Sequence, residues 1–179
     1  MISFEEYAKA VYPFLDVTPF HQTYYRVLQM FAEGRIRRLI VTMPPQHGKS
    51  VGSTTLLPAY LLGLDPDLRV AIASYSASLA NKFNRRVQRI IESKEYSEIF
   101  PLTTIKQGGK PANYIRTADE VEIIGRRGEL LSVGREGALT GNRVDVFILD
   151  DLYKDAMEAN SPVTRENCWE WYTSVVRTR

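Results

Sequence analysis

The sequence predicts a single α/β domain with a mainly parallel central sheet flanked by helices. Short apolar runs rich in β-branched residues alternate along the chain with longer segments whose apolar residues recur at helical spacing, and this alternation is typical of such sheets. Of the 179 residues, 44% are hydrophobic and 25% are charged, which is ordinary for a globular protein and excludes a largely disordered chain. No repeat or linker interrupts the pattern, so we expect one domain over residues 1–179.

Two strands and three helices are expected in the first half of the chain. Residues 37–43 form a short apolar, β-branched run that ends at two consecutive prolines, which is typical of a buried strand followed by a loop. Residues 69–74 form a second run of the same kind. The helices are expected over residues 3–12, 20–33 and 49 to about 63.

The second half is expected to begin with an amphipathic helix over residues 79–91, whose apolar residues fall on one face. Residues 144–149 form a continuous apolar strand that ends in two aspartates. A final helix is expected over residues 162–177, with Ser161 as its N-cap and Pro162 at its first position. Between these elements we expect a loop over 101–111 and short antiparallel strands over 113–117, 120–124 and 129–134.

The composition excludes several classes of protein. The longest apolar run, residues 56–64, is about half as long as a membrane-spanning helix requires, so no membrane segment is expected. The N-terminus lacks the basic start and apolar core of a secretion signal. Cys168 is the only cysteine, and His21 and His47 are the only histidines, which leaves no internal disulfide and little for a cysteine- or histidine-based metal site. The net charge of +2 does not by itself indicate a nucleic-acid-binding protein.

The segment Pro44-Pro45-Gln46-His47-Gly48-Lys49-Ser50 lies between a predicted strand and a predicted helix, which is where a phosphate-binding loop belongs. The start of a helix offers unpaired N–H groups and a positive dipole end to an anion. Gly48 would let the backbone approach the phosphates, Lys49 would neutralise β- and γ-phosphate oxygens, and Ser50 would supply a hydroxyl to Mg²⁺. The strict sequence pattern of a phosphate-binding loop has a glycine where this chain has Met43. The alternative interpretation of the segment is an ordinary surface turn. The residues expected to contact the nucleotide are Pro45, Gln46, His47, Gly48, Lys49, Ser50 and Val51.

The run Val144–Asp151 is an apolar strand that delivers two carboxylates at its C-terminal end, as a Walker B strand does. Ligands of open α/β sheets collect at those ends. Asp150 would hold Mg²⁺ through water, and Asp151 would orient or deprotonate the attacking water. Most ATPases with a Walker B strand have glutamate at the position of Asp151. The alternative interpretation is a strand followed by an acidic turn without a catalytic role.

Gln22, near the start of the helix predicted over 20–33, is a candidate for recognising adenine. A glutamine amide has one acceptor and two donors, so it can pair with both N6 and N7 of that base. The alternative is that Gln22 is an ordinary residue of the helix start.

These motifs, together with Pro19-Phe20-His21-Gln22 and Trp169-Glu170-Trp171-Tyr172, resemble the large terminase subunit of tailed double-stranded DNA bacteriophages and prophages. The resemblance runs from about residue 15 to the end of the chain. It implies an ASCE-type P-loop ATPase domain that uses ATP and Mg²⁺ to move double-stranded DNA into an empty procapsid. The nuclease domain of the family would lie beyond Arg179, so no nuclease activity is expected of this chain.

The same resemblance implies particular partners. They are a portal protein, a small terminase subunit and further copies of this chain in a ring, at the portal vertex of the procapsid in the host bacterial cytoplasm. We expect the isolated chain to be a monomer.

An arginine finger from a neighbouring subunit is also implied by the resemblance. Similar terminases carry it immediately before the glycine that precedes the Walker B strand, where this chain has Thr140 before Gly141. Arg143 is closer to the strand, while Arg135 lies on a glycine-rich loop that would project outward. For each arginine the alternative is a solvated surface residue.

Four basic residues of the helix predicted over 79–91, Lys82, Arg85, Arg86 and Arg89, share one face. Such a row would follow DNA phosphates without reading sequence, or it would be a solvated face or a subunit contact. Arg35, Arg37 and Arg38 form a smaller cluster with the same alternatives.

Two other functions remain open at this stage. One is a helicase-like superfamily 2 translocase, which Gln22 and the aspartate pair allow, although the chain has Asp-Asp-Leu-Tyr in place of the usual tetrad. The other is a non-catalytic nucleotide- or DNA-binding module.

Overall fold

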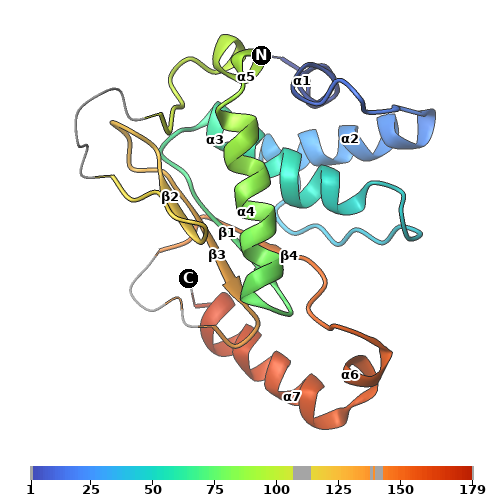
Figure 1. Ribbon diagram of the computed structural model, residues 1–179. Helices are drawn as coiled ribbons and strands as arrows, with labels where there is room; N and C mark the ends of the chain where they lie inside the picture. Colours follow the sequence, from blue (N-terminus) through green and yellow to red (C-terminus); the bar gives the residue numbers. More distant parts are fainter. Residues whose placement is uncertain (1, 107–113, 138, 140–142, 179) are drawn as a thin grey trace.

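The computed structural model describes residues 2–106, 114–137, 139 and 143–178. A four-stranded mixed sheet with the order β2-β3-β1-β4 forms its centre (Figure 1). The strands are β1 (Arg69–Ser74), β2 (Glu120–Glu122), β3 (Glu129–Gly134) and β4 (Val146–Leu149). β1 pairs in parallel with β3 and with β4, whereas β2 is antiparallel to β3. The α/β class is therefore confirmed, with two parallel pairings and one antiparallel pairing.

β1 lies between β3 and β4, and its sequence explains this place. Val70, Ala71, Ile72, Ala73 and Ser74 are all fully buried, as expected of a parallel strand covered on both faces. Val70 and Ile72 belong to the main core, while Ala71 belongs to a second apolar cluster. Successive residues of a strand point to opposite faces, so the sheet separates these two cores.

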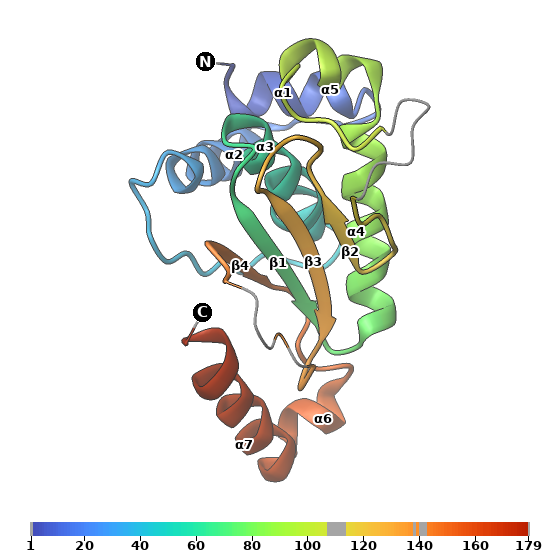
Figure 2. The same cartoon turned by 90° about the vertical axis from the view of Figure 1, so that its left-hand side faces the viewer.

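Helices from the first 100 residues cover the face that carries the main core (Figure 2). They are α1 (Phe4–Val11), α2 (Pro19–Ala32), α3 (Leu57–Leu64), α4 (Ala77–Ile91) and α5 (Lys94–Ile99), with a π-helical segment η1 (Val51–Leu56) leading into α3. The C-terminal helices α6 (Ala156–Asn160), α7 (Pro162–Trp171) and the π-helical η2 (Tyr172–Val176) lie at the end of the sheet where β1 and β3 finish (Figure 2). Trp171 packs edge-on against Phe147 of β4, which attaches α7 to the sheet.

All five predicted helices are confirmed, and their local signals work as expected. The Ser161 hydroxyl accepts a hydrogen bond from the backbone of Thr164, and Pro162 opens α7. The helix predicted from Lys49 is present as η1 and α3. Two short helices, α5 and α6, were not predicted from the sequence.

The strand predicted over residues 37–43 is wrong. Residues 39–43 form no strand and lie against α2, where they line a cavity of about 370 Å³ with Phe20 and Tyr24. Ile40 is 91% exposed, whereas a strand inside a parallel sheet is buried on both faces. β4 is thus an edge strand of the described sheet.

The predicted strand 113–117 is also not present as a strand in its described part, where Arg116 forms only an isolated bridge with Val121. Residue 113 and residues 107–111 of the predicted loop lie outside the described residues.

Candidate functional site

The 44–50 loop and the end of β4 meet through side chains far apart in the sequence. Lys49 Nζ donates a hydrogen bond of 2.7 Å to Asp150 Oδ1 and lies 3.4 Å from Asp151 Oδ1. β4 is parallel to β1, so both strands end at the same edge of the sheet, and the loop faces that edge. The structure thus brings together the lysine and the two carboxylates that the sequence indicated.

Asp150 is the best-buried charged group of this site, with 3% of the side chain exposed. Thr54 of η1 donates a hydrogen bond of 2.7 Å to its second oxygen. Burial by itself raises the pKa of Asp150, but hydrogen bonds from Lys49, Ser50 and Thr54 outweigh it, and the pKa falls below its usual value. Asp150 is therefore ionised at neutral pH.

Lys49 keeps its charge as well. Partial burial opposes the ammonium form, but the hydrogen bond and attraction of Asp150, with a smaller contribution from Asp151, raise the pKa of Lys49. The ion pair is accessible from one side, because 31% of the Lys49 side chain and 55% of the Asp151 side chain are exposed.

The loop has the backbone conformation that glycine favours. Within the loop, Gly48 has a φ of 79° and Gln46 a φ of 63°. Asp151, which follows β4 on the other side of the site, also has a positive φ, of 50°. An added Cβ at Gly48 would lie 3.6 Å from the ring of His21. Positive φ at a non-glycine residue is uncommon and costs energy, so surrounding contacts must hold this geometry in place.

α2 supplies those contacts. The Tyr24 hydroxyl donates a hydrogen bond of 2.8 Å to the carbonyl of Lys49. A side chain at Gly52, one turn further on, would overlap the Tyr24 ring. The rings of Phe20 and His47 are also in contact, with centroids 6.1 Å apart. The start of α2 therefore packs directly on the loop.

Gln22 lies on this same first turn of α2, one residue after His21. Its side-chain amide donates a hydrogen bond of 3.3 Å to Glu5 on α1. The structure places Gln22 on the helix that packs on the loop, with its amide directed to α1.

The two candidate finger arginines differ in their surroundings. Arg135 is 12% exposed, and its guanidinium donates to the carbonyl of Leu152 at 2.8 Å and to Glu158 at 3.0 Å. Arg143 is 75% exposed and pairs with Asp145 at 3.3 Å. Arg135 therefore holds the segment that follows Asp151, whereas Arg143 is accessible to a neighbour. Thr140 and Gly141 lie outside the described residues.

Sequence reasoning missed Thr54, Tyr24 and Ser74. Thr54 was within reach, because it lies four residues after Ser50 and hence on the same helix face. Ser74 ends β1 beside the site, where the next backbone N–H donates to the carbonyl of Asp151. Its hydroxyl is buried without a hydrogen-bond partner in the described part of the chain. No pattern along the chain marks Tyr24 or Ser74.

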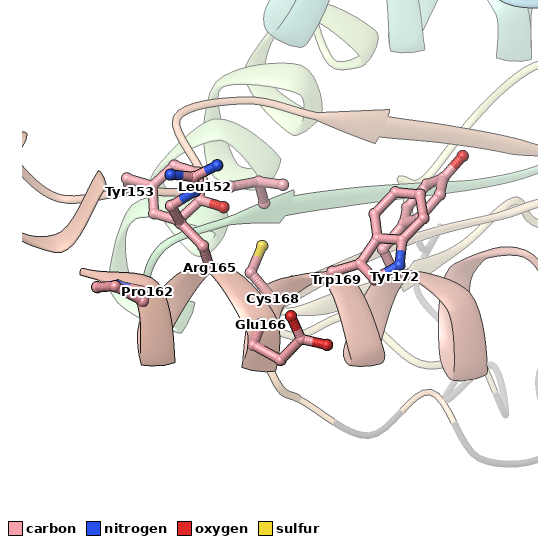
Figure 3. A pocket seen from close by; sticks show the side chains of 8 residues that line it. All are labelled: Leu152, Tyr153, Pro162, Arg165, Glu166, Cys168, Trp169 and Tyr172. Carbon is pink, nitrogen blue, oxygen red and sulfur yellow. The ribbon is translucent and has the colours of Figure 1, made fainter. Parts of the chain in front are cut away.

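A cavity of about 640 Å³ lies between α7 and the segment after Asp151 (Figure 3). Neither Lys49 nor Asp150 lines it. Its lining residues are Leu152, Tyr153, Pro162, Arg165, Glu166, Cys168, Trp169 and Tyr172.

Among the residues that the structure describes, no three or more His, Cys, Asp or Glu side chains converge on a metal position. An ion at this site would depend on Asp150 and the Ser50 hydroxyl. None of the described helices combines the length and apolar character that crossing a bilayer requires.

One comparison with known proteins places the chain. A family model described as the terminase large subunit, T4likevirus-type, N-terminal, matches residues 40–179. Neither a curated protein nor a solved structure matches the chain significantly.

Proposed function

Because this chain belongs to the family of terminase large subunits, we propose that it is the ATP-hydrolysing motor domain of a phage DNA-packaging machine, with a P-loop fold of the ASCE type. The observation that carries the proposal is the 2.7 Å contact between Lys49 Nζ and Asp150 Oδ1. It joins a helix-start loop suited to phosphate with the carboxylate-bearing end of a parallel strand.

Residues of the 44–50 loop would bind the phosphates of ATP. Residues 46–51 offer backbone N–H groups at the start of a helix, and Lys49 offers an ammonium group whose charge is secured by Asp150. Asp151 presents a half-exposed carboxylate at 3.4 Å from the same ammonium, so we assign it the role of orienting the attacking water. Gln22 is assigned to adenine, which would replace Glu5 as the partner of its amide.

The residues around Asp150 fit a magnesium ion. Mg²⁺ prefers oxygen ligands and is usually held by one or two carboxylates together with substrate phosphates and water. Asp150 is ionised, and the Ser50 hydroxyl is among the groups that lower its pKa. When bound, the ion would neutralise charge on the phosphate oxygens.

The partners follow from the family. We propose that the chain acts on double-stranded DNA in the infected cell, together with a portal protein, a small terminase subunit and further copies of itself in a ring. A finger supplied by the next copy would complete the site, and the exposed Arg143 suits this role better than Arg135, which is engaged within its own chain.

Phosphate release from ATP and Mg²⁺ over a wide range of protein concentration tests the proposal. We expect turnover per chain to rise with concentration, because the finger comes from a neighbour, and to disappear in Lys49→Ala. Lys94→Ala is the matched control, since Lys94 is 84% exposed and pairs with Glu98 on α5. Turnover that is equal in wild type and Lys49→Ala would contradict the proposal, and nucleotide binding without turnover would favour a binding module.

A further inference from the structure

α4 carries a row of four cations on its outward face, defined by Lys82, Arg85, Arg86 and Arg89 and called the basic face below. All four are exposed, and α4 contains no acidic residue. Within the described ranges none of the four forms an ion pair. One contact is present, between the Arg86 guanidinium and the ring of Phe83 at 5.8 Å.

This arrangement destabilises the isolated helix. Each of the four has two others three or four positions away, and like charges at that spacing repel one another. Elsewhere the chain pairs such cations, as in Lys9 with Glu5 and Lys94 with Glu98. α4 forms nevertheless, because Phe83, Val87 and Ile90 on its opposite face are buried in the main core.

The shape of the row indicates what kind of anion would offset the repulsion. Lys82 and Arg89 are separated by about 10 Å along the helix. The cations stand side by side on one helix face, and none of them lines either of the two cavities described above, so they do not converge on one small anion. A linear polyanion suits such a row, and duplex DNA carries one charge for about every 1.7 Å of its axis.

An anionic membrane is less suitable. Surfaces that bind bilayers combine basic residues with exposed large apolar side chains. The described chain exposes such side chains on other elements, among them Phe20, Met157 and Trp169, and none of them on α4.

α4 also starts at the candidate site. The backbone N–H of Tyr75, just before the helix, donates to the carbonyl of Asp151 at 2.9 Å. Ala77, the first residue of α4, packs closely on Gly134 of β3. A Cβ added at Gly134 would lie only 2.7 Å from the backbone nitrogen of Ala77. The helix α4 therefore starts beside the ends of β1 and β3 (Figure 1), next to the backbone contact of Tyr75 with Asp151, and carries the basic face further along its length.

We infer that the basic face of α4 binds the phosphate backbone of double-stranded DNA without reading its sequence. The choice of DNA as the polyanion rests on the proposed function, and the contact of α4 with the site adds a direct mechanical connection between nucleotide and DNA.

Binding of a short fluorescent duplex of mixed sequence, measured by anisotropy over a range of KCl concentrations, tests the inference. Arg85→Gln/Arg86→Gln is the test variant, and Arg126→Gln/Arg127→Gln, at the exposed turn before β3, is the control with the same loss of charge. We expect affinity at low salt to fall at least about tenfold in the test variant and the slope of log K against log salt to shrink by about 2. The control is expected to keep the wild-type slope, and Arg85→Lys/Arg86→Lys is expected to restore most of it.

Equal weakening by the test and control variants would show that net charge alone matters and would overturn the inference. Unchanged binding in a folded test variant would overturn it too and would leave a subunit contact as the role of the basic face. Thermal unfolding of each variant checks the fold.

ATP turnover without DNA separates this inference from the proposed function. If the wild-type chain hydrolyses ATP in a Lys49-dependent way but the test variant binds DNA as the wild type does, only the inference about the basic face is rejected. If the test variant binds DNA about tenfold more weakly but the wild-type chain shows no Lys49-dependent turnover, only the proposed ATPase function is rejected.

Discussion

Replacing Thr54 with valine tests how the carboxylate of Asp150 is held in place. Thr54 is fully buried, and its hydroxyl donates a hydrogen bond of 2.7 Å to Asp150 Oδ2. Valine has nearly the same shape but no donor. A hydrogen bond to a charged group contributes about 1.5–3 kcal/mol, so we expect the free energy of unfolding at neutral pH to fall by about 2 kcal/mol. For a domain of this size the Tm would fall by about 4–8 °C.

The effect is expected to depend on pH through Asp150. Although burial opposes them, hydrogen bonds from Lys49, Ser50 and Thr54 lower the pKa of Asp150 in the folded chain. The stability they provide is present above the unfolded-state pKa, about 3.9, and is lost as the pH falls through the lower folded-state pKa. The difference between wild type and Thr54→Val should therefore be largest at neutral pH and shrink in acid.

Thermal unfolding followed by circular dichroism, from neutral pH to about pH 3, measures this difference. Thr55→Val is the matched control, because the neighbouring Thr55 hydroxyl is buried without a hydrogen-bond partner in the described chain. Its stability should be unchanged or higher at every pH. A Thr54→Val protein as stable as wild type at neutral pH, or destabilised equally at all pH values, would refute the reasoning.

Three further predictions concern the loop and the arginines. Gly52→Ala should lower the free energy of unfolding by about 1–3 kcal/mol in chemical denaturation, because the new methyl group meets the Tyr24 ring; wild-type stability would contradict this packing. Asp151→Asn should keep the fold, since asparagine tolerates the φ of 50°, but should lose ATP turnover by about 100-fold or more; retained turnover would exclude Asp151 from orienting water. Arg143→Ala should abolish the rise of turnover with protein concentration, whereas Arg135→Ala should lower turnover at every concentration by loosening the segment after Asp151. If instead Arg135→Ala abolished the concentration dependence and Arg143→Ala lowered turnover at every concentration, Arg135 would be the finger and Arg143 the structural residue.

Local sequence signals predicted the elements whose cause is local. The capping residue Ser161 and Pro162 mark the start of α7, and the continuous apolar run over 69–74 marks the central strand β1. The amphipathic helix α4 follows in the same way from the periodicity of its apolar residues.

The predicted strand over residues 37–43 shows where that reasoning fails. Its β-branched composition favours an extended chain, but a strand also needs a neighbour that accepts its hydrogen bonds. Such a neighbour is distant in the sequence. In the structure these residues lie on α2, with Ile40 almost fully exposed, and composition alone cannot distinguish the two outcomes.

For the candidate site, the sequence alone indicated Lys49, Asp150 and Asp151. The signals for these residues are local: a glycine in a loop before a helix marks Lys49, and the end of an apolar strand marks the two aspartates. The place of Thr54 four residues after Ser50 is a local feature, but only the folded chain showed that its hydroxyl contacts Asp150 and that Arg135 turns inward to Leu152. It also revealed that no carboxylate of the described chain pairs with the basic face of α4. Hydrogen bonds and charge pairing depend on which distant segments become neighbours, and packing of the core determines that choice.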